Sequence, residues 1–277
     1  MKTPGIIIKY VFLLLPILTY SQEREIIDTV KTEFVYEYMF QQDSMSESSI
    51  KSQLMVLQLG NRFSRFTGEN IPAQDSIFEA NKNTDTQHII NQLLPLMTSQ
   101  PGNILADYSI YKSFLEKGSI EMTSVLSPDN YYRVVQKIRY QWSIINSADT
   151  IILGYPCKKA RTHFAGRDYT AWFTPEIPVS DGPYKFYGLP GLIVLIEDSQ
   201  KQHRFELLST RKPKYLKPIY YQHKSYITIT PQQYIKVIEQ VNNHRYEKFS
   251  NMSEFSEENL GQVLRRTKMR NNFIERY

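Results

Sequence analysis

Alternation of apolar and polar side chains recurs along the chain and predicts a protein built mainly of β-strands. From Glu33 to Phe40, aromatic residues occupy every second position, which is the period of a half-buried strand. The pair Gly60-Asn61 is typical of a tight hairpin, because both residues tolerate positive φ. Similar alternation, or short apolar runs bounded by turn residues, predicts further strands at 54–59, 62–66, 119–126, 131–145, 150–155, 158–164, 168–173, 192–197, 203–209 and 226–229.

Two segments instead repeat their apolar residues with helical spacing. The first, at 89–97, follows the capping-box pair Thr84 and Gln87 and is predicted to kink or end near Pro95. The second begins at Thr230-Pro231 with the capping-box residue Gln233, and its apolar face is predicted to pack on the sheet. Short connections between strands favour antiparallel pairing. The predicted fold class is therefore α+β and β-rich: a single curved, mostly antiparallel sheet, in one variant a partly open barrel, with a few covering helices.

The N terminus has the pattern of a secretory signal peptide. Lys2 and Lys9 precede the apolar run 10–18, and the small residues Thr19 and Ser21 follow at alternate positions. An apolar core of about nine residues is shorter than the roughly 20 that a membrane-spanning helix needs. We expect residues 1–21 to be cleaved, which leaves no permanent transmembrane segment, and 22–277 to form a single β-rich domain with a basic C-terminal tail. An uncleaved anchor is the alternative.

Composition and charge further limit the class of protein and the kinds of partner. With 41% hydrophobic and 22% charged residues, the chain can bury a core and is neither disordered nor fibrous. Six basic residues face one acidic residue within 200–217, and five face one within 265–277. Outside the cytoplasm the natural anionic partners of such segments are lipid head groups or envelope glycans, and nucleic acid is not expected. A solvated surface without any partner explains the same charges.

One segment resembles a known family. The chain contains ILGYPCKKA at 152–160 and the hexapeptide GLPGLI at 188–193, and the distinctive region runs from Ile152 to Asp198. In these motifs the sequence resembles the GLPGLI family, also called Porph_ging. The resemblance implies an exported protein of bacteria with two membranes, and it carries no assigned activity, catalytic residue or cofactor.

The hexapeptide also has a physical interpretation. Leu189-Pro190-Gly191-Leu192 predicts a type II turn, since proline fixes one φ and glycine permits the next to be positive. Asp181-Gly182-Pro183 predicts another chain reversal, so 175–191 should form a proline-rich loop that leads into a strand at 192–196 buried on both faces. The residues predicted to shape this loop are Gly182, Pro183, Gly188, Leu189, Pro190 and Gly191.

Two interpretations of this loop stay open. In the first the loop caps one end of the sheet, and its aromatic residues are a structural plug. In the second it belongs to a ligand site, because aromatic rings supply contact area and a few charges orient a ligand. The candidate ligand-binding residues are Arg167, Trp172, Tyr184, Lys185 and Tyr187.

Signals for catalysis or metal binding are weak. The five histidines show no paired ligand spacing, so we expect no metal site, and no cofactor-binding motif occurs. Cys157 is the sole cysteine, which excludes an internal disulfide and makes it a weak catalytic candidate beside Lys158 and Lys159.

Three functions follow from these observations. The first is a non-catalytic envelope protein, periplasmic, associated with the outer membrane or secreted, that binds an apolar or amphipathic ligand or a partner protein. The second is a structural or assembly partner in the envelope. The third is a thiol-dependent enzyme using Cys157. An empty apolar interior would favour the first function, and a filled interior the second.

Overall fold

The computed structural model describes residues 24–98, 108–127, 130–250 and 271–277. The predicted signal peptide and most of the basic C-terminal tail lie outside these residues. The strands are β1 (Arg24–Thr29), β2 (Thr32–Gln41), β3 (Ile50–Leu59), β4 (Phe63–Gly68), β5 (Tyr108–Ser113), β6 (Ser119–Ser127), β7 (Asn130–Lys137), β8 (Ser143–Ile152), β9 (Tyr155–Phe164), β10 (Arg167–Thr174), β11 (Leu192–Asp198), β12 (His203–Arg211), β13 (Pro218–Gln222) and β14 (Tyr226–Thr228). The helices are the short 3-10 helix η1 (Glu47–Ser49), α2 (Ile71–Ala80), α3 (Thr86–Thr98) and α4 (Pro231–Ser250).

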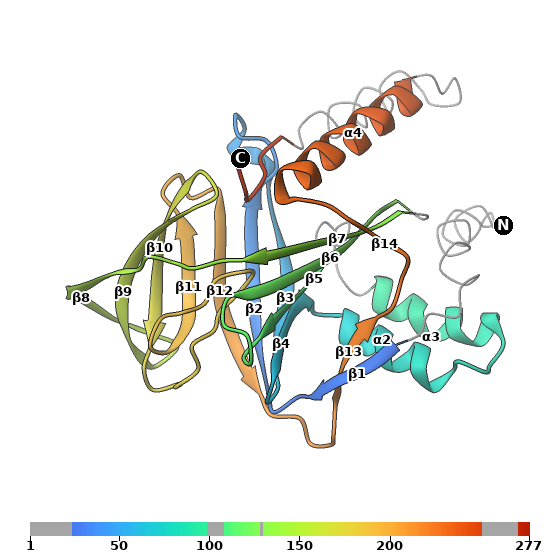
Figure 1. Ribbon diagram of the computed structural model, residues 1–277, viewed down its shortest axis with the longest axis horizontal. Helices are drawn as coiled ribbons and strands as arrows, with labels where there is room; N and C mark the ends of the chain where they lie inside the picture. The colour runs from blue at the N-terminus through green and yellow to red at the C-terminus, as the bar shows by residue number, and fades with distance from the viewer. Residues whose placement is uncertain (1–23, 99–107, 128–129, 251–270) are drawn as a thin grey trace, which may run out of the picture.

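Twelve of these strands form one curved sheet in the order β14-β7-β6-β5-β4-β3-β2-β12-β11-β10-β9-β8 (Figure 1). Every neighbouring pair is antiparallel except β14 with β7. The sheet does not close into a barrel, and β8 and β14 are its two edges. The predicted fold class is therefore confirmed in its open form. A separate two-stranded sheet pairs β1 with β13.

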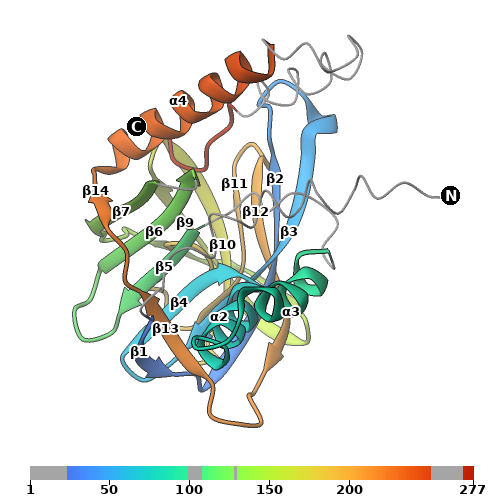
Figure 2. The same cartoon turned by 90° about the vertical axis from the view of Figure 1, so that its right-hand side faces the viewer.

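The helices lie at two different places on the sheet. α4 packs on β6 and β7, whereas α2 packs on α3 and on β13 (Figures 1 and 2). The predicted capping box of α4 is formed, because Gln233 N–H donates to Thr230 Oγ1 and Thr230 N–H donates to Gln233 Oε1. At α3 the predicted cap is wrong by one residue: the Gln87 N–H donates to the Asp85 carboxylate. α3 also continues past Pro95.

β11 is part of the buried core. It is buried on both faces from Leu192 to Ile196, as its run of apolar residues predicts. Tyr36 on β2 is fully buried, and its hydroxyl donates to the Ile193 carbonyl at 2.8 Å. The GLPGLI segment is thereby fixed against the centre of the sheet.

The predicted strand at 131–145 is wrong in its length. The structure divides it into β7 and β8 and leaves 138–142 irregular. Here the backbone accepts hydrogen bonds from side chains, since the Ile138 carbonyl receives the Tyr187 hydroxyl and the Gln141 carbonyl receives the Thr162 hydroxyl. Trp142 in turn donates its indole N–H to the Tyr187 carbonyl at 2.9 Å. Aromatic packing with the loop takes the place of strand pairing in this stretch.

The predicted hairpin at Gly60-Asn61 forms, but not because these residues adopt a positive φ. Neither residue has a positive φ, and the Gly60 N–H donates to the Phe63 carbonyl. A Cβ on Gly60 would lie 2.4 Å from an Asp28 carboxylate oxygen. That carboxylate accepts the backbone N–H groups of Arg62 and Phe63. Glycine is needed here because Asp28 approaches the turn closely.

Candidate functional site beneath the C-terminal segment

The loop that ends in GLPGLI is closed by backbone hydrogen bonds. An isolated bridge joins Asp181 to Tyr187, and the Ile193 N–H donates to the Asp181 carbonyl at 3.0 Å. The type II turn predicted at Leu189–Leu192 is wrong. The Gly191 N–H donates to the Leu189 carbonyl around Pro190, and the Leu192 N–H donates to Ile177 instead. Because Leu192 pairs with a distant residue, the turn closes one residue earlier.

Gly191 and Gly182 are nevertheless required by the loop. Gly191 has a φ of +150°, and a Cβ there would lie 2.1 Å from the Thr174 carbonyl oxygen. A Cβ on Gly182 would lie 2.8 Å from the Cβ of Ile193. Both positions bring two chain segments closer than any side chain allows.

Lys185, a candidate ligand-binding residue, lies in a buried ion pair. Its ammonium group is 2.5 Å from the Glu275 carboxylate and donates to Gln136 Oε1 at 2.6 Å. Its side chain has no exposed surface, and that of Glu275 is only 4% exposed. Burial lowers the pKa of Lys185, and the neighbouring Glu275 opposes that shift. Glu275 also accepts the Tyr184 hydroxyl at 2.6 Å, so two of the candidate residues hold the C-terminal segment.

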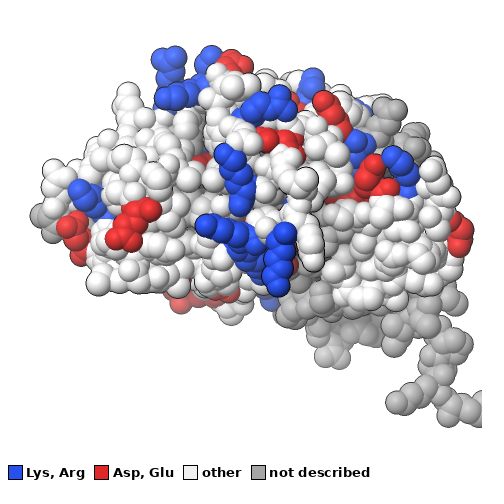
Figure 3. Space-filling view, turned by 90° about the horizontal axis from the view of Figure 1, so that it is seen from below, with Lys and Arg blue, Asp and Glu red and all other residues white. Residues whose placement is uncertain are grey.

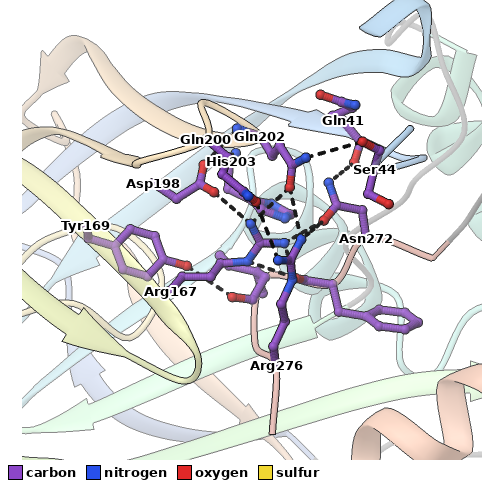
Figure 4. Close-up of polar contacts among 12 residues, drawn as sticks. Gln41, Ser44, Arg167, Tyr169, Asp198, Gln200, Gln202, His203, Asn272 and Arg276 are labelled. Atoms are coloured by element: carbon purple, nitrogen blue, oxygen red, sulfur yellow. Dashed lines mark hydrogen bonds and ion pairs between the residues drawn. The ribbon is translucent and has the colours of Figure 1, made fainter. Parts of the chain in front are cut away.

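Arg167 also binds the C-terminal segment, through Asn272 and the Phe273 carbonyl (Figure 4). Its guanidinium forms a buried ion pair with Asp198 at 2.6 Å and donates to Asn272 Oδ1 at 2.5 Å and to the Phe273 carbonyl at 2.8 Å. Arg276 donates to the same Asn272 oxygen at 2.8 Å. Residues 271–277, which we call the C-terminal segment, are therefore held by several buried side chains rather than by strand pairing.

A cavity of about 290 Å³ lies between this segment, α4 and the sheet. Aromatic and aliphatic side chains make up most of its wall, and a few polar groups interrupt them. The lining residues are Tyr38, Phe40, Gln42, Tyr108, Met122, Ser124, Val125, Leu126, Tyr184, His203, Tyr234, Ile235, Ile238, Val241, Asn242, Asn272, Phe273, Ile274 and Glu275. Such a wall is typical of small-molecule sites, and the volume lies just below their usual range of about 300–1,000 Å³.

His203 is the polar group of this wall that lacks a partner on one side. Its Nδ1 shares a 2.8 Å hydrogen bond with the Tyr38 hydroxyl, whereas its Nε2 has no hydrogen-bond partner among the described residues. Burial holds the pKa of His203 well below its usual 6.5, and the cations Arg167 and Arg276 lower it further. The Phe273 carbonyl opposes this lowering without reaching hydrogen-bond geometry. Burial therefore favours the neutral form of the imidazole, and its Nε2 is itself fully buried.

The remaining candidate residues lie elsewhere. Trp172 is half-buried on β10 with the Lys159 ammonium over its ring, and Tyr187 lines a second cavity of about 320 Å³. The buried pair Lys112 and Asp181 also lines that second cavity, with Lys112 donating to the Gly182 carbonyl at 2.6 Å. Of the five predicted ligand residues, only Tyr184 lines the first cavity.

Cys157 is 1% exposed, and its thiol donates to the Tyr155 carbonyl. Burial raises the pKa of this thiol, which is the opposite of the shift that activates a cysteine nucleophile. His163, six residues along β9, is exposed and binds Asp168 at 2.8 Å. Within the described ranges no three His, Cys, Asp or Glu side chains cluster as a metal site, and no helix there is long and apolar enough to span a membrane.

Sequence reasoning missed His203, Tyr38 and the C-terminal contacts Asn272 and Glu275. No local pattern marks them, because the residues that meet at the cavity are far apart in the chain: Tyr38 and His203 are separated by 165 positions. Glu275 lies within the tail that the sequence describes only as basic.

Comparison with known proteins agrees with the sequence motifs. Residues 158–195 match the family model described as "Protein of unknown function (Porph_ging)". This segment is similar to the Porph_ging family. It runs from β9 through β10 and the GLPGLI loop into β11, and so contains Arg167, Tyr184 and Lys185. The predicted GLPGLI resemblance is confirmed over these residues.

The likeness to the solved structures described here is distant. No curated protein matches the chain. Two solved structures, described as "Structure of PNGF-II in P21 space group" and "Structure of PNGF-II in C2 space group", align with TM-scores of 0.49 and 0.47 at 15% identity. Each alignment covers 78% of this chain and 34% of the other, so this chain spans about a third of their length.

Proposed function

We propose that this chain is an exported, non-catalytic protein of the bacterial envelope that binds a small apolar or amphipathic ligand. The ligand lies in the cavity beneath α4 and the C-terminal segment. The observation that carries the proposal is the 290 Å³ cavity with its largely apolar wall. Support for export comes from the signal-peptide pattern at 1–21.

The wall indicates which chemistry the ligand has. Apolar side chains favour an alkyl or aromatic body, and the few polar side chains among the lining residues suit one small polar end. Glu275, the charged residue among those that line the cavity, is already neutralised by the buried Lys185. A neutral polar end, such as a hydroxyl, therefore suits the site better than a second carboxylate beside Glu275.

The test is a calorimetric titration of the protein with decanol. Val241→Trp on α4 fills the cavity, since Val241 lines it, and should abolish binding. Val237→Trp is the matched control, because Val237 is half-buried on the same helix but does not line the cavity. Binding that survives Val241→Trp, or an absence of binding in the wild type, would contradict the proposal. Thermal melts of both variants establish that each is folded.

A structural or assembly role is the second candidate, and one observation favours it. β8 is an edge strand of the sheet, and its side chains Ile144 and Ile151 are 43% and 75% exposed. An edge with exposed apolar residues can pair with a strand of another chain. Sedimentation analysis tests this role: Ile151→Lys should dissociate a complex that forms through β8 and leave decanol binding unchanged.

A further inference from the structure

The connection between β12 and β13 projects from the end of the sheet opposite η1 (Figure 1). We call residues 212–217 the tip loop. Two apolar side chains stand in it almost fully exposed, Tyr215 at 86% and Leu216 at 91%. Among the described residues only Met45 has a large apolar side chain as exposed as these. Two adjacent side chains of this kind at a protruding tip need a physical explanation.

Cations surround the tip. Lys212 and Lys214 are exposed and form no ion pair with any described residue. Lys31 is exposed on the adjoining turn, which is joined to the loop by the Val30 N–H donating to the Lys217 carbonyl at 2.8 Å. Lys and Arg side chains gather at the centre of this face (Figure 3). The nearby carboxylates of Glu69 and Glu33 already form ion pairs.

Those acidic groups hold the loop in place. Glu69 binds Arg211 at 2.7 Å, and Glu33 binds Lys217 at 2.6 Å. Pro213 and Pro218 restrict the backbone at both ends. The tip loop is thus a fixed projection whose free charges are positive and whose most exposed side chains are apolar.

We propose that the tip loop docks on an anionic phospholipid bilayer. Tyr215 and Leu216 enter the interface between head groups and acyl chains, while Lys212, Lys214 and Lys31 lie against the phosphates. Apolar residues and lysines on one tip are what such a surface selects, since each lysine near it strengthens association by roughly fivefold. A protein partner is less suited to this tip, because stable interfaces bury about 800 Å² on each side. This docking is independent of the cavity.

The experiment is vesicle co-sedimentation of the exported chain. Vesicles contain either phosphatidylcholine alone or equal parts of phosphatidylglycerol and phosphatidylcholine. We expect binding to the anionic vesicles only, weakened by added salt. The double variant Lys212→Gln/Lys214→Gln should lose roughly 25-fold in partition, by the fivefold contribution of each lysine, and Tyr215→Ser/Leu216→Ser should lose at least tenfold. All variants carry the same N terminus, so differences between them report the loop.

Matched controls lie at the opposite end of the sheet. Met45→Ser removes a side chain that is 90% exposed, and Lys51→Gln removes an exposed lysine there; both should bind vesicles like the wild type. Val241→Trp should also bind normally, which separates this proposal from the cavity. Equal binding by the tip-loop variants and the wild type would overturn the proposal. So would a shift from dimer to monomer in Tyr215→Ser/Leu216→Ser without loss of vesicle binding, because the loop would then be a contact between copies.

Discussion

The ion pair between Lys185 and Glu275 allows a quantitative test of how the C-terminal segment is held. Both side chains are buried, and Glu275 also accepts the Tyr184 hydroxyl and the Tyr277 hydroxyl. Removing one partner of a buried pair leaves an uncompensated charge and costs about 3–5 kcal/mol, whereas replacing both by apolar residues is often nearly neutral. The variants are Lys185→Met, Glu275→Leu and the double variant.

The magnitudes differ between the two single variants. In Lys185→Met the carboxylate keeps two hydroxyl donors, so we expect a loss of about 3 kcal/mol in the free energy of unfolding. In Glu275→Leu the Lys185 ammonium keeps only Gln136 as acceptor and the Tyr184 hydroxyl loses its partner, so we expect about 5 kcal/mol. The double variant removes both charges and leaves mainly the Tyr184 hydroxyl unsatisfied, at about 1–3 kcal/mol.

Urea unfolding with the m-value checked for each variant measures these differences. The account requires the double variant to be more stable than Glu275→Leu alone. If instead the two single losses simply add in the double variant, Lys185 and Glu275 do not act as a pair and the reasoning is refuted. Lys185→Ala is unsuitable as a test of ligand binding, because loss of this buried ion pair destabilises the fold.

Three further outcomes are expected. Because the pKa of His203 lies well below 6.5 in the folded state, the unfolded chain binds the extra proton, so the free energy of unfolding falls as the pH is lowered from about 7 to 5; in His203→Gln this fall should be smaller, and equal slopes in urea titrations would contradict the assignment. Gly191→Ala should be severely destabilising, because its Cβ meets the Thr174 carbonyl, whereas Gly154→Ala, with φ +81° and open space, should cost only about 1–2 kcal/mol in the same assay. Cys157 should react with a maleimide only after denaturation, and rapid labelling of the folded protein would restore the thiol-enzyme alternative.

Local patterns predicted much of the sheet. Alternation of apolar and polar residues predicted β2, and the continuous apolar run predicted that β11 is buried on both faces. Both predictions are possible because the residues of a strand themselves show which of its faces are buried. The same holds for the Thr230 capping box, which acts within four residues. The short strands β1, β5 and β13 were not predicted, since their few apolar residues set no clear period.

The site was less predictable, because its contacts are not local. Arg167 and Lys185 look like ligand-binding cations in the sequence, yet the structure gives them buried partners. Arg167 meets Asn272 across 105 positions, and Tyr184 meets Glu275 across 91. The sequence shows that a residue is charged but not which residue it pairs with. A lysine or arginine in a buried ion pair therefore looks the same in the sequence as one that binds a ligand.

The most direct measurement of the central claim is native mass spectrometry of the protein purified from its native source. We expect the folded wild type to carry one small apolar or amphipathic molecule, Val237→Trp to carry the same molecule, and Val241→Trp to be empty. A wild type that carries nothing, or a Val241→Trp protein that retains the adduct, would contradict the assignment of the cavity as the binding site.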